Sequence, residues 1–146
     1  MARQTSENWF GCPFRFGANV LGDGWSLLIL RDLIFREARH YGDFVAAGEG
    51  ISTNILADRL QRLEAEGVIS KQQDPDRAVR VIYRLTEKGR GLVPILMAII
   101  DWSEQWDDRT EVPAAFIKAY REDRSGFVAS VVDGLELAEA KPGEGA

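Results

Sequence analysis

Cysteine and histidine are almost absent from this 146-residue sequence, which contains only Cys12 and His40. One cysteine is not enough for a disulfide within the chain, and it fits a reducing compartment. One cysteine and one histidine, far apart in sequence, do not suffice for a structural zinc site, so we predict no metal. The sequence also lacks a paired nucleophile and base and a glycine-rich phosphate loop. We therefore predict neither catalytic residues nor a cofactor, and we expect that the protein is not an enzyme.

Long hydrophobic runs are also missing, because no apolar stretch approaches the roughly 18–20 residues that cross a bilayer. The first ten residues, MARQTSENWF, lack the apolar segment of a secretory signal. We therefore expect a cytoplasmic protein with no membrane partner. With 45% apolar residues, the chain has enough material for one buried core. Residues 141–146 are rich in glycine and proline, which predicts a frayed tail.

The net charge of −5 argues at first against a nucleic-acid partner, but the charge is unevenly distributed. Residues 107–146 carry 5 basic and 9 acidic residues, whereas residues 51–90 carry 8 basic and 6 acidic ones. Most of the acidic excess therefore lies in the C-terminal part. The region with a basic excess remains compatible with DNA.

Apolar periodicity and capping residues predict four helices, then two strands, then two further helices. The helices cover 13–21, 24–34, 40–47 and 52–66, and the strands cover 68–73 and 79–85. A long helix follows over 87–106, bent or ended early by Pro94, and another begins at Pro113 with a break at Gly126. A short helix, a tight turn, a capped helix and a hairpin together form a winged helix-turn-helix. We thus predict a mainly α fold with a small two-stranded β-hairpin and extra terminal helices for dimerisation.

The helix predicted over 52–66 has the size of an element that enters a DNA major groove. Leu56, Leu60 and Leu63 share one face and would anchor the helix to the core. Its outward side carries the predicted DNA contacts, which are Ser52, Thr53 and Asn54 at the start and Arg59 and Arg62 further along. Such side chains hydrogen-bond to base edges and phosphates. For this helix alone, a solvated amphipathic surface explains the pattern equally well.

The predicted hairpin carries Arg77 and Arg80 close to its tip. A wing uses such residues on phosphates or in a minor groove, although an ordinary charged turn has the same composition. The position of the hairpin directly after the predicted recognition helix favours the DNA interpretation. Arg39 and His40, at the start of the third helix, are weaker candidates for phosphate contacts.

Cys12 precedes the first predicted helix, where the helix dipole favours a thiolate and hence oxidation or reaction with electrophiles. A small buried residue near the core is the alternative. The aromatic residues near both ends of the predicted domain favour a dimer interface over a ligand pocket; they are Trp9, Phe10, Phe14, Phe16, Trp25, Trp102 and Trp106.

Several short motifs, in this order, resemble the HxlR-type winged-helix regulators of bacteria. They begin with Cys12-Pro13 and with Asp23-Gly24-Trp25, followed by LILRDL over 28–33. They continue with RHYGDF over 39–44, GISTNILADRLQRL over 50–63 and EGVI over 66–69, and they end with YRLTEKG over 83–89 and Trp102. The resemblance covers most of the chain, from Cys12 to about Trp106.

The resemblance implies a homodimer that binds an inverted repeat in double-stranded DNA and that dimerises through its terminal helices. It also implies that the cysteine matching Cys12 senses reactive species in several relatives. Two features depart from the family: His40 stands where relatives often have arginine, and the acidic part beyond Trp106 is longer than usual. We expect an HxlR-type domain over 1–106, a helical extension over 107–140 that contributes to the dimer interface, and the tail over 141–146.

The sequence as a whole predicts a sequence-specific transcriptional regulator that acts as a repressor on a palindromic operator. Its effector would be a thiol-modifying electrophile at Cys12 or a small molecule. A winged-helix protein-interaction module without DNA binding is the alternative, which the acidic net charge favours slightly. A related MarR-type or PadR-type regulator is a further one.

Overall fold

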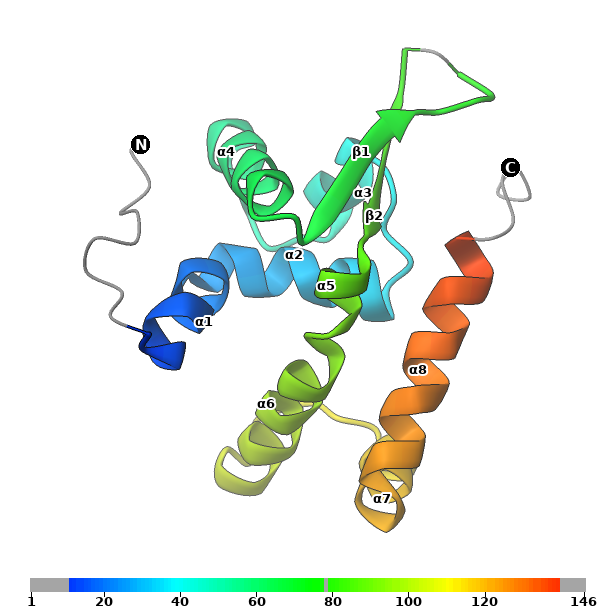
Figure 1. Ribbon diagram of the computed structural model, residues 1–146. Helices are drawn as coiled ribbons and strands as arrows, with labels where there is room; N and C mark the ends of the chain where they lie inside the picture. Colours follow the sequence, from blue (N-terminus) through cyan, green and yellow to red (C-terminus); the bar gives the residue numbers. More distant parts are fainter. Residues whose placement is uncertain (1–10, 78, 140–146) are drawn as a thin grey trace.

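The computed structural model describes residues 11–77 and 79–139, and Figure 1 shows their arrangement. The predicted tail over 141–146, together with Trp9 and Phe10, lies outside these residues. Four helices come first: α1 (Pro13–Leu21), α2 (Gly24–Phe35), α3 (Tyr41–Ala46) and α4 (Thr53–Ala65). The strands β1 (Ile69–Gln73) and β2 (Val81–Leu85) follow. The remaining helices are α5 (Glu87–Arg90), α6 (Val93–Trp106), α7 (Ala114–Glu122) and α8 (Arg124–Glu139).

The helix starts in the N-terminal half follow the predicted capping residues. Pro13 occupies the first turn of α1, where its missing N–H group is not needed. The side chain of Asp23 accepts a hydrogen bond from the backbone N–H of Ser26 and caps α2. The side chain of Ser52 accepts one from the backbone N–H of Ile55 and caps α4. After α4 the chain turns at Gly67, whose φ of 73° lies in the left-handed region that favours glycine.

The two strands form an antiparallel hairpin in which Ile69 pairs with Leu85 and Gln73 pairs with Val81. The second strand begins two residues later than predicted, because Val79 is 94% exposed and lies in the turn. In Figure 1 this hairpin, the wing, projects from the same end of the molecule as α4, whereas α6 and α7 extend toward the opposite end. The fold is therefore the predicted winged helix-turn-helix, mainly α with one small sheet.

Two helix breaks differ from the sequence prediction. The predicted helix over 87–106 is divided before Pro94, because α5 ends at Arg90 and α6 starts at Val93 with the proline in its first turn. The predicted break at Gly126 is wrong, since the chain bends at Asp123 instead. The Asp123 side chain accepts a hydrogen bond from the backbone N–H of Gly126. A Cβ atom at Gly126 would lie 2.0 Å from that carboxylate, so the glycine makes room for the bend.

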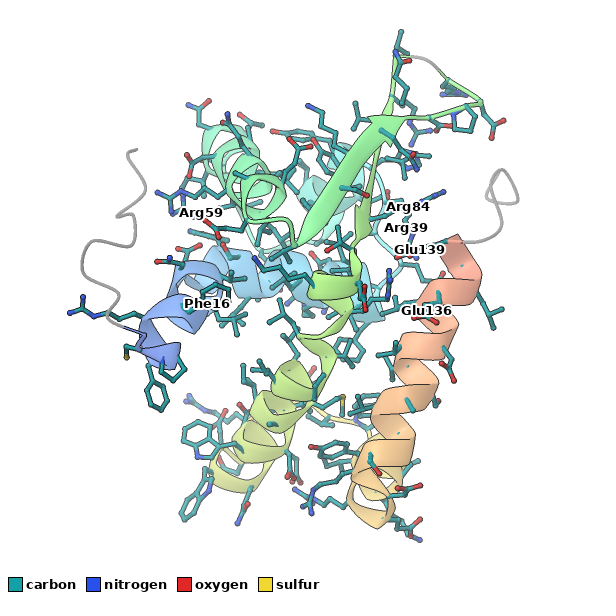
Figure 2. All side chains as sticks on the ribbon, viewed as in Figure 1. Phe16, Arg39, Arg59, Arg84, Glu136 and Glu139 are labelled. Carbon is teal, nitrogen blue, oxygen red and sulfur yellow. The ribbon has the colours of Figure 1, made fainter. Side chains whose placement is uncertain are left out.

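The helices beyond the wing form a second layer beside the N-terminal half. Helix α8 packs along α6 and α7. The edge-to-face pair of Phe35 and Phe116, with ring centroids 6.1 Å apart, joins α7 to α2. Phe127 of α8 stacks on Phe116 in the same way, at 5.0 Å. The C-terminal end of α8 returns to the wing, so that Glu139 lies beside Arg39 and Arg84 (Figure 2).

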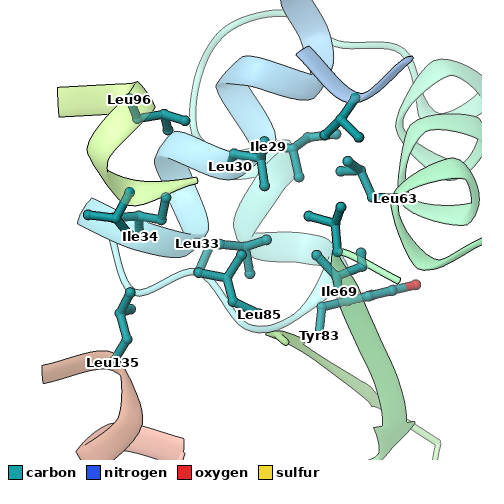
Figure 3. Packing of buried hydrophobic residues seen from close by; sticks show 14 of the residues in the cluster. Ile29, Leu30, Leu33, Ile34, Leu63, Ile69, Tyr83, Leu85, Leu96 and Leu135 are labelled. Carbon is teal, nitrogen blue, oxygen red and sulfur yellow. The ribbon is translucent and has the colours of Figure 1, made fainter. Parts of the chain in front are cut away.

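The core lies between α2, α4, the hairpin and the first turns of α6 (Figure 3). Its most deeply buried side chains include Leu30, Leu33, Leu56, Leu60 and Leu63. Leu56, Leu60 and Leu63 are the predicted anchoring face of α4. Burial of one such side chain stabilises the fold by roughly 1.5–3 kcal/mol. This core therefore fixes the position of α4 relative to α2.

Within the described residues, no helix is long and apolar enough to cross a membrane.

Candidate nucleic-acid interface

The N-terminal side of α4 is an exposed polar surface. Ser52, Thr53 and Asn54 are all exposed, whereas Leu56 and Leu60 on the opposite face are buried. The hydroxyl group of Tyr41 on α3 donates a hydrogen bond to the carbonyl oxygen of Thr53 at 2.9 Å. The start of α4 is thus held by its own cap and by the preceding helix. Its short polar side chains are exposed to solvent, an arrangement suited to contacts with a groove.

The two arginines further along α4 have carboxylate partners. The guanidinium group of Arg59 contacts Asp23 through two nitrogens, at 2.7 and 3.3 Å, and Arg59 also contacts Asp58. Arg62 pairs with Asp58 at 3.2 Å, and 40% of its side chain is exposed. The hydrogen bond from Arg59 lowers the pKa of Asp23, although burial opposes this effect, and the same bond raises the pKa of Arg59. Arg59 therefore joins α4 to the cap of α2, and a DNA contact by Arg59 would require this pair to open.

The tip of the wing carries exposed cationic and apolar side chains. Arg77 and Arg80 are both exposed, and Val79 lies between them in sequence. The turn is closed by backbone hydrogen bonds from the N–H of Asp74 to the carbonyl of Arg80 and from the N–H of Arg80 to the carbonyl of Arg77. The wing tip thus presents two exposed guanidinium groups.

Asp74 is the buried residue at the start of this turn, with only 8% of its surface exposed. Its carboxylate holds the turn through two contacts. One carboxylate oxygen accepts a hydrogen bond from the backbone N–H of Asp76, which lowers the pKa of Asp74, and His40 lowers it further. The other oxygen lies 3.1 Å from Nε2 of His40, which must carry the proton because an ionised carboxylate only accepts. His40 therefore connects the start of α3 to the base of the wing tip.

Arg39 and His40, both predicted as phosphate contacts, are half-buried between α3 and the wing. The backbone carbonyl of Arg39 accepts a hydrogen bond from the N–H of Tyr83 in β2, at 2.7 Å. The guanidinium group of Arg39 donates to the carbonyl oxygens of Leu33 and Ala38. The carboxylate of Asp43 accepts from the backbone N–H groups of Arg39 and His40. These contacts give both residues a structural role beside any role in DNA binding.

A second exposed surface lies away from α4 and the wing tip, and it is apolar. On α1, Phe14 is 85% exposed, and on α6, Trp102 and Trp106 are 66% and 71% exposed. Ile95 and Ile99 of α6 are exposed as well. Cys12, the N-cap of α1, is half-buried. Exposed apolar surface of this extent is typical of a protein–protein contact.

The sequence did not reveal the polar contacts that hold these elements. Asp23 was predicted only as a cap, and Asp74 only as a turn residue, because their partners Arg59 and His40 lie 36 and 34 positions away. The one signal for these contacts was the presence of acidic residues at two turns and of cationic residues in elements predicted to pack nearby. Among the residues that the structure describes, no group of three or more His, Cys, Asp or Glu side chains lies close enough to hold a metal ion.

Comparison with known proteins matches residues 20–111 to the HxlR-like helix-turn-helix family. YvaP of Bacillus subtilis, an uncharacterized HTH-type transcriptional regulator, is 36% identical over 98 residues, which are 66% of this chain and 90% of YvaP. The crystal structure of PA1607 is similar, with a TM-score of 0.66 and 39% identity over 74% of this chain and 76% of that one. The redox regulator HypR in its oxidized form has a TM-score of 0.58 and 27% identity, covering 69% of this chain and all of HypR. The match ends at residue 111, so α7 and α8 lie beyond it.

Proposed function

The chain belongs to the HxlR-like helix-turn-helix family of transcriptional regulators, and we propose that it binds a palindromic operator as a homodimer and acts as a repressor. The observation that carries the proposal is the exposed polar start of α4, a helix held by a buried leucine face at the same end of the molecule as the cationic wing (Figure 1). A cytoplasmic location is part of the proposal, because operator DNA lies there.

In this proposal the first turn of α4 enters the major groove. Asn54 contacts base edges, and Ser52 and Thr53 contact bases or phosphates. Arg62 on the flank of α4 reaches a base or the backbone. Arg59 would contribute mainly by holding α4 on Asp23, at 2.7 Å.

The remaining contacts are electrostatic. Arg77 and Arg80 on the wing tip bind phosphates or enter the minor groove, and Arg39 and His40 are secondary candidates for the backbone. The net charge of −5 does not oppose this proposal, because the acidic excess is concentrated in the C-terminal part of the chain.

The homodimer is supported by the apolar surface of α1 and α6, where Phe14, Trp102 and Trp106 are all more than half exposed. A second copy of the chain would cover these rings, and a two-fold pair matches a palindromic site. We assign residues 1–106 to the winged-helix domain and residues 107–140 to an extension that enlarges the dimer interface. Trp102→Glu should yield a monomer in sedimentation experiments. Val45→Glu, a matched change at an exposed position of α3, should leave a dimer.

The DNA-binding proposal is tested by measuring binding to fragments from around the protein's own gene as the salt concentration increases. We expect tight binding to one fragment, weakening steeply with salt as counterions are released. If the dimer binds no fragment even at low salt, the proposal fails, and a winged-helix module that binds another protein becomes the better interpretation.

The effector is either an electrophile that modifies Cys12 or a small molecule. The likeness to HypR supports the thiol, because HypR is a redox regulator and Cys12 occupies the N-cap position of α1, the helix that carries Phe14 of the proposed dimer surface. Diamide should release the operator from the wild-type protein but not from Cys12→Ser. Equal release from both proteins would exclude Cys12 as the sensor and leave a small-molecule effector.

A further inference from the structure

The C-terminal end of α8 contacts the base of the wing through one arginine. Arg90 of α5 donates a hydrogen bond from Nη1 to the Glu139 carboxylate at 2.7 Å, and its Nε lies 3.6 Å from the carboxylate of Glu136. The same Nη1 donates to the carbonyl oxygen of Leu85, the last residue of β2, at 3.1 Å. A single guanidinium group therefore joins α8 directly to the wing.

A second contact supports the first. Arg84, in β2, lies 3.5 Å through Nη1 from the backbone carbonyl oxygen of Glu139, at the helix end where carbonyl groups lack partners. One turn earlier, Leu135 is 7% exposed and packs into the common core. The end of α8 is thus anchored by an apolar side chain and by polar contacts to two residues of the β2–α5 segment. Figure 2 shows Glu136 and Glu139 on the side of α8 that faces Arg84 and Arg39.

The ion pair offsets only part of the free-energy cost of burying the Glu139 carboxylate. Burial raises the pKa of Glu139, although Arg90, Arg84 and Arg39 oppose this effect. A carboxyl group whose pKa is raised on folding favours the folded state at low pH, and this contribution is lost as pH rises through that pKa. Burying the ionised carboxylate of Glu139 therefore costs free energy of folding. A residue that positions the wing, and does not mainly stabilise the fold, would have this property.

The packing of α8 on α6 connects this contact to the proposed dimer surface. Helix α8 packs on α6, whose exposed rings Trp102 and Trp106 form the proposed dimer surface. The chain of contacts from that surface to the wing is continuous: it runs from α6 to α8, then through Glu139 to Arg90, and finally to Leu85 of β2. The extension beyond residue 111 thus connects the helix that carries the proposed dimer surface to the base of the wing.

We propose that the C-terminal end of α8 is a brace that positions the wing, with Glu139 holding Arg90 and Arg84 against the base of the hairpin. Glu139 and Arg90 are positioning residues that touch no DNA. The consequence for operator binding rests on the proposed function, whereas the mechanical role of the brace does not.

The brace is tested first without DNA, by hydrogen exchange of backbone amides in the full-length protein. Glu139→Gln removes the charge and keeps the shape, and we expect faster exchange across Val81–Leu85 while α4 is unchanged. The matched control is Glu122→Gln, since Glu122 lies on α7 with its side chain 66% exposed and 3.8 Å from Lys118. This control removes the same charge and should leave exchange in the wing unchanged. Unchanged exchange in the wing of Glu139→Gln would overturn the brace.

Operator binding then supplies a readout that a merely structural role would not change. Removing an acidic charge should tighten DNA binding slightly, and Glu122→Gln should do so. Glu139→Gln should instead weaken binding by about tenfold, because the wing is no longer positioned. Its unfolding midpoint should be equal to or higher than that of the wild type. Binding tighter than that of Glu122→Gln would show a carboxylate that competes with DNA and would overturn the brace.

Combined variants identify the part of the interface that is affected. With Glu139→Gln already present, Arg80→Ala should cost less binding than it does in the wild-type protein, whereas Asn54→Ala should keep its full cost. If Arg80→Ala weakens operator binding equally in the wild-type protein and in Glu139→Gln, the brace is contradicted. Failure of the wild-type protein to bind any fragment would instead refute the proposed function, and the hydrogen exchange experiment would still decide on the brace.

Discussion

The helix α4 and the wing lie at the same end of the molecule, but different forces hold them. Three leucines on one face of α4 are almost completely buried, and an ion pair from Arg59 to Asp23 of the α2 cap lies at its flank. The wing is a two-stranded hairpin whose base is packed into the same core through Ile69 of β1 and Tyr83 and Leu85 of β2, whereas the rest of β1 is exposed. Polar contacts are added to this packing at both ends of the hairpin: Asp74 with His40 at the tip, and Arg90 with Glu139 at the base.

This difference predicts that the two parts of the interface respond to different changes. A packed apolar face has one low-energy arrangement, so α4 should move only when the core does. Beyond its buried base the hairpin has little apolar contact, because residues 70–73 of β1 are exposed, so its orientation there depends on neighbouring polar groups. The position of the wing can therefore be altered without unfolding the protein, by removing one charge or one hydrogen bond.

The largest effect is expected from a change that removes the anchor of α4. Leu60→Ala should lower the free energy of unfolding by about 2–5 kcal/mol, because Leu60 is 2% exposed and its loss leaves a cavity. Urea denaturation measures this loss. Gln61→Ala, on the exposed side of the same helix, should change the stability by less than about 0.5 kcal/mol. Equal effects of the two changes would show that the buried face does not hold α4.

A smaller effect is expected at the polar link between α4 and α2. Asp23→Ala removes both the cap of α2 and the partner of Arg59, and it should cost about 1–2 kcal/mol of stability. Asp23→Asn keeps a capping side chain and loses only the charge, so it should cost less.

The same link predicts a dependence on pH. Arg59 lowers the pKa of Asp23 in the folded protein, so the stabilisation is present above the unfolded pKa of about 4 and is lost as pH falls below it. The unfolding free energy of Asp23→Asn should therefore fall less than that of the wild-type protein below this pH. Parallel pH profiles for the two proteins would contradict the link.

The smallest effect on stability is expected at the tip of the wing. His40→Ala removes the hydrogen bond to Asp74 and should cost at most about 1.5 kcal/mol, whereas operator binding should weaken severalfold because the wing tip loses its support. His40→Gln retains a side-chain N–H donor and should restore part of the binding. If His40→Ala binds the operator like the wild type, the wing tip is positioned without this contact.

The sequence predicted the elements that depend on local patterns. Asp23 and Ser52 stand directly before apolar periodic segments, and both act as the predicted helix caps. The spacing of Leu56, Leu60 and Leu63 likewise gave the buried face of α4. The break at Asp123 was missed because Gly126 looked like the breaking residue, whereas its small size serves the cap formed three positions earlier.

Contacts between distant segments were beyond the reach of such patterns. Arg59 was predicted as a DNA contact from its place on the polar side of α4, and its partner Asp23 becomes apparent only when α2 and α4 are packed together. Glu139 and Arg90 are separated by 49 positions. In the sequence, each is an ordinary charged residue at the end of a helix. The contact between the acidic C-terminal part and the wing, with Glu139 beside Arg84, depends on the packing of α8 and has no local sequence signal (Figure 2).

The division of roles between α4 and the wing is tested most directly by selecting operators from a random DNA library with three proteins. The wild-type dimer should select an inverted repeat. Asn54→Ala should lose base preference within each half-site, and Arg80→Ala should select the same repeat with uniformly lower affinity. If Asn54→Ala selects the wild-type repeat with wild-type affinity, α4 does not read the operator as proposed, and the account of this surface is wrong.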